Sequence, residues 1–242
     1  MPMTQAQPFN FLFGSPYWII VGCLLFSVWF IALVVVLLWE KIGPKPSKSV
    51  TIDGTKIELW ERERKLPGSS DAIVVPVATN MKMSTGISKW VRDSTANAIQ
   101  YEALRVAPMK PGSAFVGSGG KYRFGNVALA VVMDETKRTS HAWITNAVAT
   151  SLTLLRDENA EVITIPDFTE DLLRQPKWIS DEQRRETCGP IARAILDGVL
   201  AGGEDVTHVR IWAWRGNNDV WKAEIDRLQQ ESKNLTVLAA SV

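Results

Sequence analysis

The uncharged run from Tyr17 to Trp39 constrains this chain more than any other feature of its sequence. About 20 apolar residues are enough to cross the hydrocarbon core of a bilayer as a helix. Tyr17 and Trp18 at one end and Trp39 at the other match the aromatic residues that gather at membrane interfaces. A cleavable signal peptide is disfavoured because no basic residue precedes the run and no small-residue cleavage site follows it. Residues 17–39 are therefore predicted to form one permanent transmembrane helix.

The residues on either side of this run predict its orientation. The tail, residues 1–16, carries no charged side chain, whereas Lys41, Lys45 and Lys48 follow the run directly. Because positive residues accumulate on the cytoplasmic side, we expect a single-pass protein with its N-terminus outside and its large domain in the cytoplasm. The three lysines are then placed to contact lipid headgroups. The "GPKPS" segment makes residues 40–49 a short, stiff linker.

The remainder of the chain has the pattern of one α/β domain, residues 50–232, with a C-terminal tail at 233–242. Asp53-Gly54 lies between two alternating segments, which predicts a hairpin turn. Five runs rich in Val and Ile predict buried strands: 72–78, 114–118, 127–133, 161–166 and 206–212. Helical periodicity follows several of them, at 87–101, 141–156 and 190–200 and in "DVWKAEIDRLQQ". Strands alternating with helices predict a mostly parallel sheet with helices on both faces.

The composition argues against several kinds of function. A formal net charge of +1 provides no field that would attract nucleic acid. The two histidines, His141 and His208, share no ligand spacing with a cysteine or a carboxylate pair, so no metal site is predicted. No histidine lies in the uncharged run to hold a haem or chlorophyll, and we expect no cofactor. A nucleophile pair of Cys188 and His208 stays open, because such partners meet only in the fold.

Several motifs resemble the macro domain, the family that binds ADP-ribose and in some members removes it from proteins. "DAIV" at 71–74 matches the start of the family signature, and Gly86-Ile87 matches the end of its glycine-rich loop. "EVITIPDF" is similar to the strand that leads into the second phosphate loop, and "THVRIWAWRGNNDVWKAEIDRL" to the last strand and helix. The resemblance implies a three-layer fold with a mixed, mostly parallel sheet, and a pocket formed by those two loops.

The residues that would touch such a ligand depart from the family pattern. Val75 and Ala78 stand where the family has ribose-binding asparagines, and "KMST" replaces the glycines before Gly86. Thr169-Glu170 replaces a Thr-Gly pair, which would put a carboxylate beside a diphosphate. The candidates for a degenerate pocket are thus the residues that remain at the matching positions: Thr79, Asn80, Gly86, Ile87, Pro166, Phe168 and Thr169. No catalytic residue is identified, and we do not expect an enzyme.

Two main hypotheses of function follow from this sequence; a third, an ADP-ribosyl hydrolase, would need a group that activates water or orients the substrate, and none is identified. In the first, the chain is a non-catalytic accessory or assembly subunit of a larger integral membrane complex, for example a photosynthetic reaction centre with its antenna, and contacts other membrane subunits. The aromatic residues expected to contact such partners are Tyr17, Trp18, Phe26, Trp29, Phe30, Trp39 and Trp214. In the second, it is a membrane-tethered module that binds ADP-ribose or another nucleotide.

Overall fold

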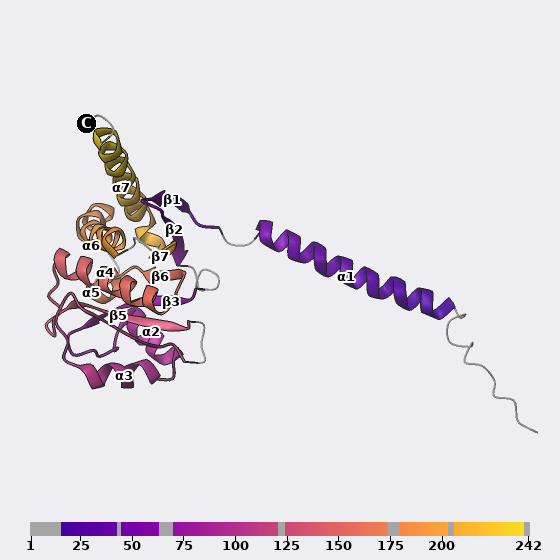
Figure 1. Ribbon diagram of the computed structural model, residues 1–242, viewed down its shortest axis with the longest axis horizontal. Coiled ribbons are helices and arrows are strands. Elements are labelled where there is room, and N and C mark those ends of the chain that lie inside the picture. The colour runs from indigo at the N-terminus through magenta and orange to yellow at the C-terminus, as the bar shows by residue number, and fades with distance from the viewer. Residues whose placement is uncertain are drawn as a thin grey trace, which may run out of the picture. The chain divides into compact units, whose positions relative to one another are not determined.

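The computed structural model describes residues 16–42, 45–62, 70–120, 124–173, 180–202 and 206–239. The chain divides into two compact units, residues 1–45 and 46–242 (Figure 1). The described part of the first unit is the helix α1, Pro16–Ile42, which is longer at both ends than the predicted 17–39. Its side chains are described from Ile20 to Val34, and nearly all of them are exposed.

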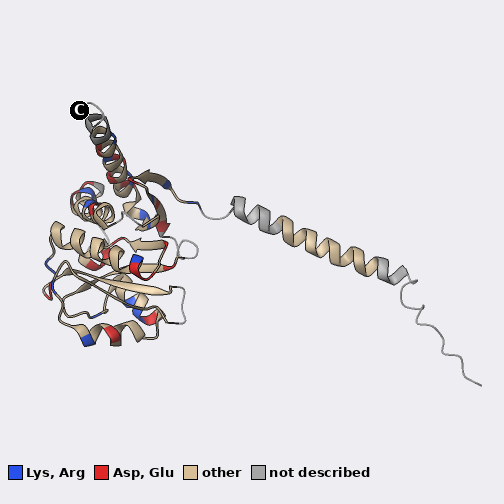
Figure 2. Ribbon diagram, in the orientation of Figure 1, with Lys and Arg blue, Asp and Glu red and all other residues tan. Residues whose placement is uncertain are grey.

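No helix in the described part of the chain combines the length and the hydropathy that a bilayer span requires. Tyr17, Trp18, Trp39 and Lys41 have side chains outside the described residues, so their predicted roles stay predictions. In Figure 2 the part of α1 whose side chains are described carries no charged residue, whereas basic and acidic residues are interspersed over the helices and strands of the domain.

The second unit is built on one seven-stranded sheet with the order β1-β2-β7-β6-β3-β5-β4. The strands are β1 (Lys48–Ile52), β2 (Thr55–Arg62), β3 (Ala72–Ala78), β4 (Ala114–Ser118), β5 (Asn126–Met133), β6 (Val162–Pro166) and β7 (His208–Trp214). The five inner strands are parallel, and β1 and β4 pair antiparallel at the two edges. The predicted mixed, mostly parallel sheet is confirmed.

The helices are α2 (Gly86–Ser94), α3 (Ala98–Val106), α4 (His141–Asp157), α5 (Thr169–Leu172), α6 (Asp181–Gly202) and α7 (Asn218–Ala239), with a short 3-10 helix η1 at Arg215–Asn217. One hydrophobic core lies between the sheet and α4, α6 and α7, where Leu152, Ile195 and Trp221 are buried. A second core lies between the sheet and α2 and α3, around Ile87 and Ile99. The domain therefore has three layers (Figure 1).

The local sequence signal at Asp53-Gly54 is confirmed by the hairpin that these residues form. Ile52 pairs with Thr55 across Asp53-Gly54, and both turn residues have positive φ, 49° and 87°, as a type I′ turn requires. β4 and β5 form a second hairpin, with antiparallel pairing from Ala114 opposite Ala130 to Ser118 opposite Asn126.

Several boundaries differ from the sequence predictions, and four differences are the largest. The helix expected over 87–101 is two helices, because Ala96 and Asn97 adopt positive φ and interrupt it. The helix expected to begin at Pro190 begins at Asp181 and contains that proline. Residues 233–239 continue α7 instead of forming a tail. The predicted linker is shorter, because α1 extends to Ile42 and β1 begins at Lys48.

Candidate functional site

Three connections lie at the carboxyl edge of the inner parallel strands, where α/β sheets usually bind ligands. Residues 79–85 follow β3, Asp167 and Phe168 lead from β6 into α5, and η1 follows β7. The chain thus brings the two predicted phosphate loops to the same edge of the sheet.

The backbone of the first loop is hydrogen-bonded within the protein. Gln100 on α3 accepts a hydrogen bond from the Met83 amide at 2.7 Å and donates one to the Met81 carbonyl at 3.0 Å. Asn80 accepts one from the Lys82 amide at 3.1 Å. The side chains of Met81 and Met83 are fully buried. Three backbone groups of this loop are therefore already satisfied by side chains of the domain.

The N-terminus of α2 is occupied by a carboxylate from α5. Asp171 Oδ2 accepts a hydrogen bond from the Ile87 amide at 3.1 Å, and Asp171 Oδ1 accepts one from Ser88 Oγ at 3.4 Å. Gly86, with φ of 53°, lies so close that a Cβ there would meet Asp171 Oδ1 at 2.5 Å. A negative group is favoured at this end of a helix because free amides and the helix dipole point toward it. Asp171 takes the position in which a helix N-terminus would hold a phosphate.

Asp171 is buried with only 1% of its surface exposed. Burial raises the pKa of its carboxyl from 3.8 to about 7, against the lowering effect of the hydrogen bond from Ile87, while the nearby Glu170 raises it further. Near neutral pH the carboxyl group therefore exists in both protonation states.

The second loop is also tied to the rest of the domain. The Thr169 amide donates to Asp167 Oδ1 at 3.0 Å. Asn217 Nδ2 donates to Asp167 Oδ2 at 2.7 Å and to Thr169 Oγ1 at 2.9 Å. Phe168 is completely buried in the core. These bonds join the loop after β6 to η1, 48 and 50 residues later in the chain.

The structure brings some of the predicted pocket residues together and separates others. Gly86 and Ile87 contact Asp171 of α5, the helix that begins at Thr169. Thr79 bonds through its backbone to Met133 and Met109, and Pro166 ends β6, paired with Trp212. The sequence predicts that the disruptive carboxylate is Glu170. The carboxylate that faces the loop is Asp171, one residue later, and Glu170 is exposed.

The remaining candidates have simpler environments. Phe26 lies with its ring centroid 6.1 Å from that of Trp29 and 6.5 Å from that of Phe30, and all three are exposed. Trp214 is 53% exposed at the end of β7. Lys45 is exposed, whereas the ammonium of Lys48 forms an ion pair with Asp226 on α7. None of these observations identifies a partner.

Cys188 and His208 do not form a nucleophile pair. Cys188 Sγ lies 3.8 Å from Asn217 Oδ1 on the α6 side of the sheet. His208 Nε2 lies 2.9 Å from Glu58 Oε2. Their neighbours in the strands, Val209 and Ile57, face the α6 side. Because successive residues of a strand point to opposite faces, His208 and Glu58 face the other side of the sheet. The sheet therefore separates Cys188 from His208. Among the described residues no group of three or more metal-ligating side chains is present.

Comparison with solved structures identifies the fold of the second unit. It is similar to the Oceanobacillus iheyensis macrodomain with ADP, with a TM-score of 0.61 and 12% identity over 76% of this chain and 97% of the other. The chain has the macrodomain fold. A mutant of the same Oceanobacillus macrodomain with ADPR matches at a TM-score of 0.59 and 12% identity, over 76% and 98% of the two chains. The Trypanosoma brucei macrodomain matches at 0.57 and 14% identity, over 75% and 72%.

The sequence relationships of this chain are distant. No family model matches the chain. An uncharacterized protein from Aquifex aeolicus (strain VF5) is 25% identical over 144 residues, which are 59% of this chain and 87% of the other. The fold is thus recognised from the three-dimensional arrangement, while the site must be judged from its own residues.

Proposed function

We propose that this protein is a non-catalytic docking subunit whose macrodomain holds its own carboxylate where a diphosphate would bind. The observation that carries the proposal is the contact of Asp171 with the first turn of α2, above Gly86. A bound phosphate would need the Ile87 amide that Asp171 already occupies.

Electrostatics also favours a self-occupied site. Two unit charges of the same sign about 4 Å apart repel by roughly 4 kcal/mol at an effective dielectric constant of about 20. A diphosphate beside ionised Asp171 would experience repulsion of this kind. To bind, it would have to displace α5, which is anchored in the hydrophobic core by its residue Leu172 and by Phe168 directly before it.

The proposed setting is a membrane. Its support is the uncharged run from Tyr17 to Trp39, which lies within the helix α1. In this proposal α1 packs against other integral membrane subunits through Phe26, Trp29 and Phe30, and the domain contacts the same complex on the cytoplasmic face. A photosynthetic reaction centre with its antenna stays one candidate host.

A second candidate function is a membrane-tethered reader of ADP-ribose or a related nucleotide. What favours it is the similarity of fold to macrodomains solved with ADP and with ADPR. It requires that Asp171 leaves the end of α2 when the ligand arrives. A hydrolase would additionally need a group that activates water or orients the substrate.

Calorimetric titration of the full-length protein in detergent with ADP-ribose separates these functions. We expect no heat of binding and no thermal shift at millimolar ligand. Binding would be detected, because a ligand at a hundredfold over its Kd would stabilise the domain by about 2.7 kcal/mol. Asp171→Ala is the matched variant: removing the carboxylate frees the Ile87 amide, and weak binding of ADP-ribose should appear.

Binding of ADP-ribose by the unaltered chain would refute the self-occupied site and support the reader. Release of ADP-ribose from a modified protein would refute the non-catalytic assignment. If neither the unaltered chain nor Asp171→Ala binds ADP-ribose, Asp171 is not what excludes the ligand. The contact between Asp171 and the Ile87 amide would then no longer support the proposal.

A further inference from the structure

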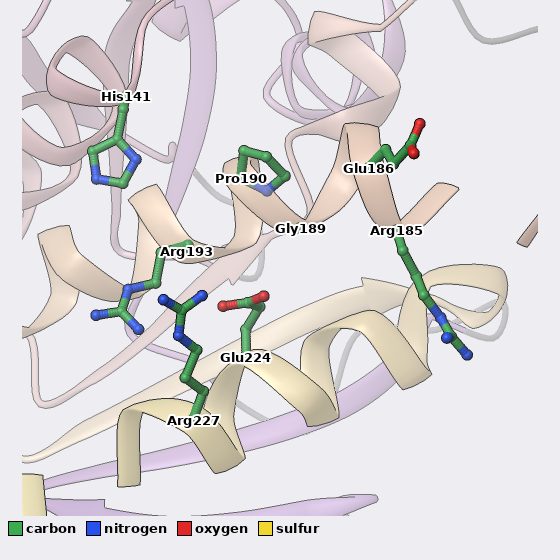
Figure 3. Close-up of a pocket in the computed structure, with 8 residues that line it drawn as sticks. All are labelled: His141, Arg185, Glu186, Gly189, Pro190, Arg193, Glu224 and Arg227. Carbon is green, nitrogen blue, oxygen red and sulfur yellow. The ribbon is translucent and has the colours of Figure 1, made fainter. Parts of the chain in front are cut away.

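A cleft of about 430 Å³ lies away from the two loops, where α6 and α7 approach the start of α4. Figure 3 shows Glu224 and Arg227 of α7 pointing toward α6, whereas Arg185 and Glu186 of α6 point away from each other. This volume is in the range of sites that hold small ligands or single side chains of a partner.

Two of the three arginines that line the cleft are already paired. Arg193 Nε lies 2.8 Å from Asp197, and Arg193 Nη2 lies 2.6 Å from Glu231. Arg227 contacts the other oxygen of Glu231 at 3.2 Å, and His141 contacts the other oxygen of Asp197 at 2.9 Å. These carboxylates leave little net positive charge to attract an anion.

Glu224 on α7 differs from these paired groups, because one of its carboxylate oxygens has no partner in the described part of the chain. Its Oε2 is out of contact with solvent and has no hydrogen-bond partner among the described residues, and the same is true of Arg193 Nη1. Glu224 Oε1 lies 3.7 Å from the position of a Cβ on Gly189 of α6, so the carboxylate reaches the facing helix. A buried carboxylate oxygen without a donor is costly, and an N–H group entering the cleft would relieve that cost.

The proline in α6 leaves a further acceptor at the cleft. Pro190 lies inside this helix and has no amide hydrogen. The carbonyl of Glu186, four residues earlier, therefore lacks its usual helical donor, and both residues line the cleft. Glu224 Oε2 and the Glu186 carbonyl are thus two acceptors at the cleft that an incoming donor could reach.

The number of charged groups at the cleft also favours a positively charged ligand. When Asp197 and Glu231 are counted with the lining residues, the cleft has three arginines (Arg185, Arg193 and Arg227) and four carboxylates, Glu186 and Glu224 being the other two. We infer that the cleft binds a basic side chain of a partner protein, Lys or Arg, at Glu224, with the adjoining peptide carbonyl accepting a hydrogen bond from Arg193 Nη1. This docking site is independent of the loops at the edge of the sheet.

Saturation-transfer NMR on the full-length protein tests the inference with three capped peptides: acetyl-Gly-Lys-Gly-amide, its Gln analogue and its Glu analogue. We expect transfer to the lysine ε-methylene protons and none to the Gln or Glu side chains. Glu224→Gln should weaken binding of the Lys peptide about tenfold or more, since it removes one partner of a buried charge pair. Asp219→Asn, an exposed carboxylate on the same helix, is the control and should leave binding unchanged.

Equal transfer to all three peptides on the unaltered chain would overturn the inference without any variant. Inorganic phosphate is the competing probe: if it displaces the Lys peptide or binds by itself, the arginines form an anion site and the inference is wrong. Glu224→Gln should melt at or above the temperature of the unaltered chain, because it removes an unpaired charge. Unchanged affinity in this folded variant would also overturn the inference.

Discussion

At the scale of single residues, Gly86 and Asp171 form the tightest contact of the candidate site. Gly86→Ala would bring a Cβ to 2.5 Å from Asp171 Oδ1 at a backbone with φ of 53°. We expect the free energy of unfolding to fall by about 1–3 kcal/mol, because both the left-handed backbone and the contact are unfavourable for alanine. Urea denaturation measures the loss.

Gly54→Ala is the matched control for this prediction. Gly54 has φ of 87° and nothing within 4 Å of its Cβ position, so it isolates the backbone part of the cost. Asp171→Ala in the Gly86→Ala background should recover part of the loss. Equal losses at the two glycines, with no recovery, would mean that Asp171 is not held against Gly86.

The raised pKa of Asp171 predicts a pH dependence of stability. Its carboxyl has a pKa of about 7 in the folded chain and an ordinary value of 3.8, so between these values the folded state binds more protons than the unfolded state. The stability that this group contributes is fully present below pH 3.8 and is lost as the pH rises through about 7. We expect the urea midpoint to fall from pH 5 to pH 8, and Asp171→Asn to flatten this decline. Parallel profiles for the two proteins would contradict the prediction.

Glu58 affects the stability of the domain at the acidic end of the same pH profile. Burial disfavours its charged form, but hydrogen bonds from Lys56, Trp60 and His208 outweigh that effect and lower the pKa from 4.5 to about 2. Its contribution is present above pH 4.5 and is lost as the pH falls through about 2. The two groups therefore destabilise the domain in separate pH windows, which makes the Asp171 decline measurable by itself.

At the scale of elements, the connection from β3 to α2 depends on α3. Gln100 bonds to both Met81 and Met83, so Gln100→Ala would leave a backbone amide and a carbonyl without partners. We expect a loss of about 1–3 kcal/mol and faster hydrogen exchange at the Met83 amide. Gln229→Ala, on α7, is a same-type control away from this loop. Unchanged exchange at Met83 would show that the loop holds its shape without Gln100.

At the scale of the whole molecule, the two units predict separable behaviour. Residues 46–242 form a compact unit with its own two cores. We expect a chain without residues 1–45 to stay in the supernatant after cell fractionation and to melt cooperatively, while the full chain sediments with membranes and resists carbonate extraction. Recovery of the full chain in the carbonate supernatant would contradict the predicted span.

The native mass of the full chain in mild detergent addresses the docking proposal at the same scale. Migration with other proteins at fixed stoichiometry is expected for a subunit, and it would name the host complex. Migration as a single species would remove the support for the accessory role and favour the nucleotide reader.

Much of this fold is determined by the sequence itself, because its signals are local. Val- and Ile-rich runs specify β3 and β5, Asp53-Gly54 specifies a turn with two positive φ angles, and "DAIV" with Gly86-Ile87 indicates the macrodomain arrangement. Each of these depends on residues a few positions apart, whose spacing fixes which side chains face the core.

Only the tertiary structure decides what occupies the candidate site. Asp171 reaches Ile87 across 84 residues of sequence, and the burial that raises its pKa exists only after α5 packs against α2. The α6–α7 cleft likewise depends on the packing of two helices. The sequence predicts that α6 begins at Pro190, but the helix begins at Asp181 and contains this proline. Periodicity specifies which face of an element is buried, but the pairing of distant polar groups is set by how the elements assemble.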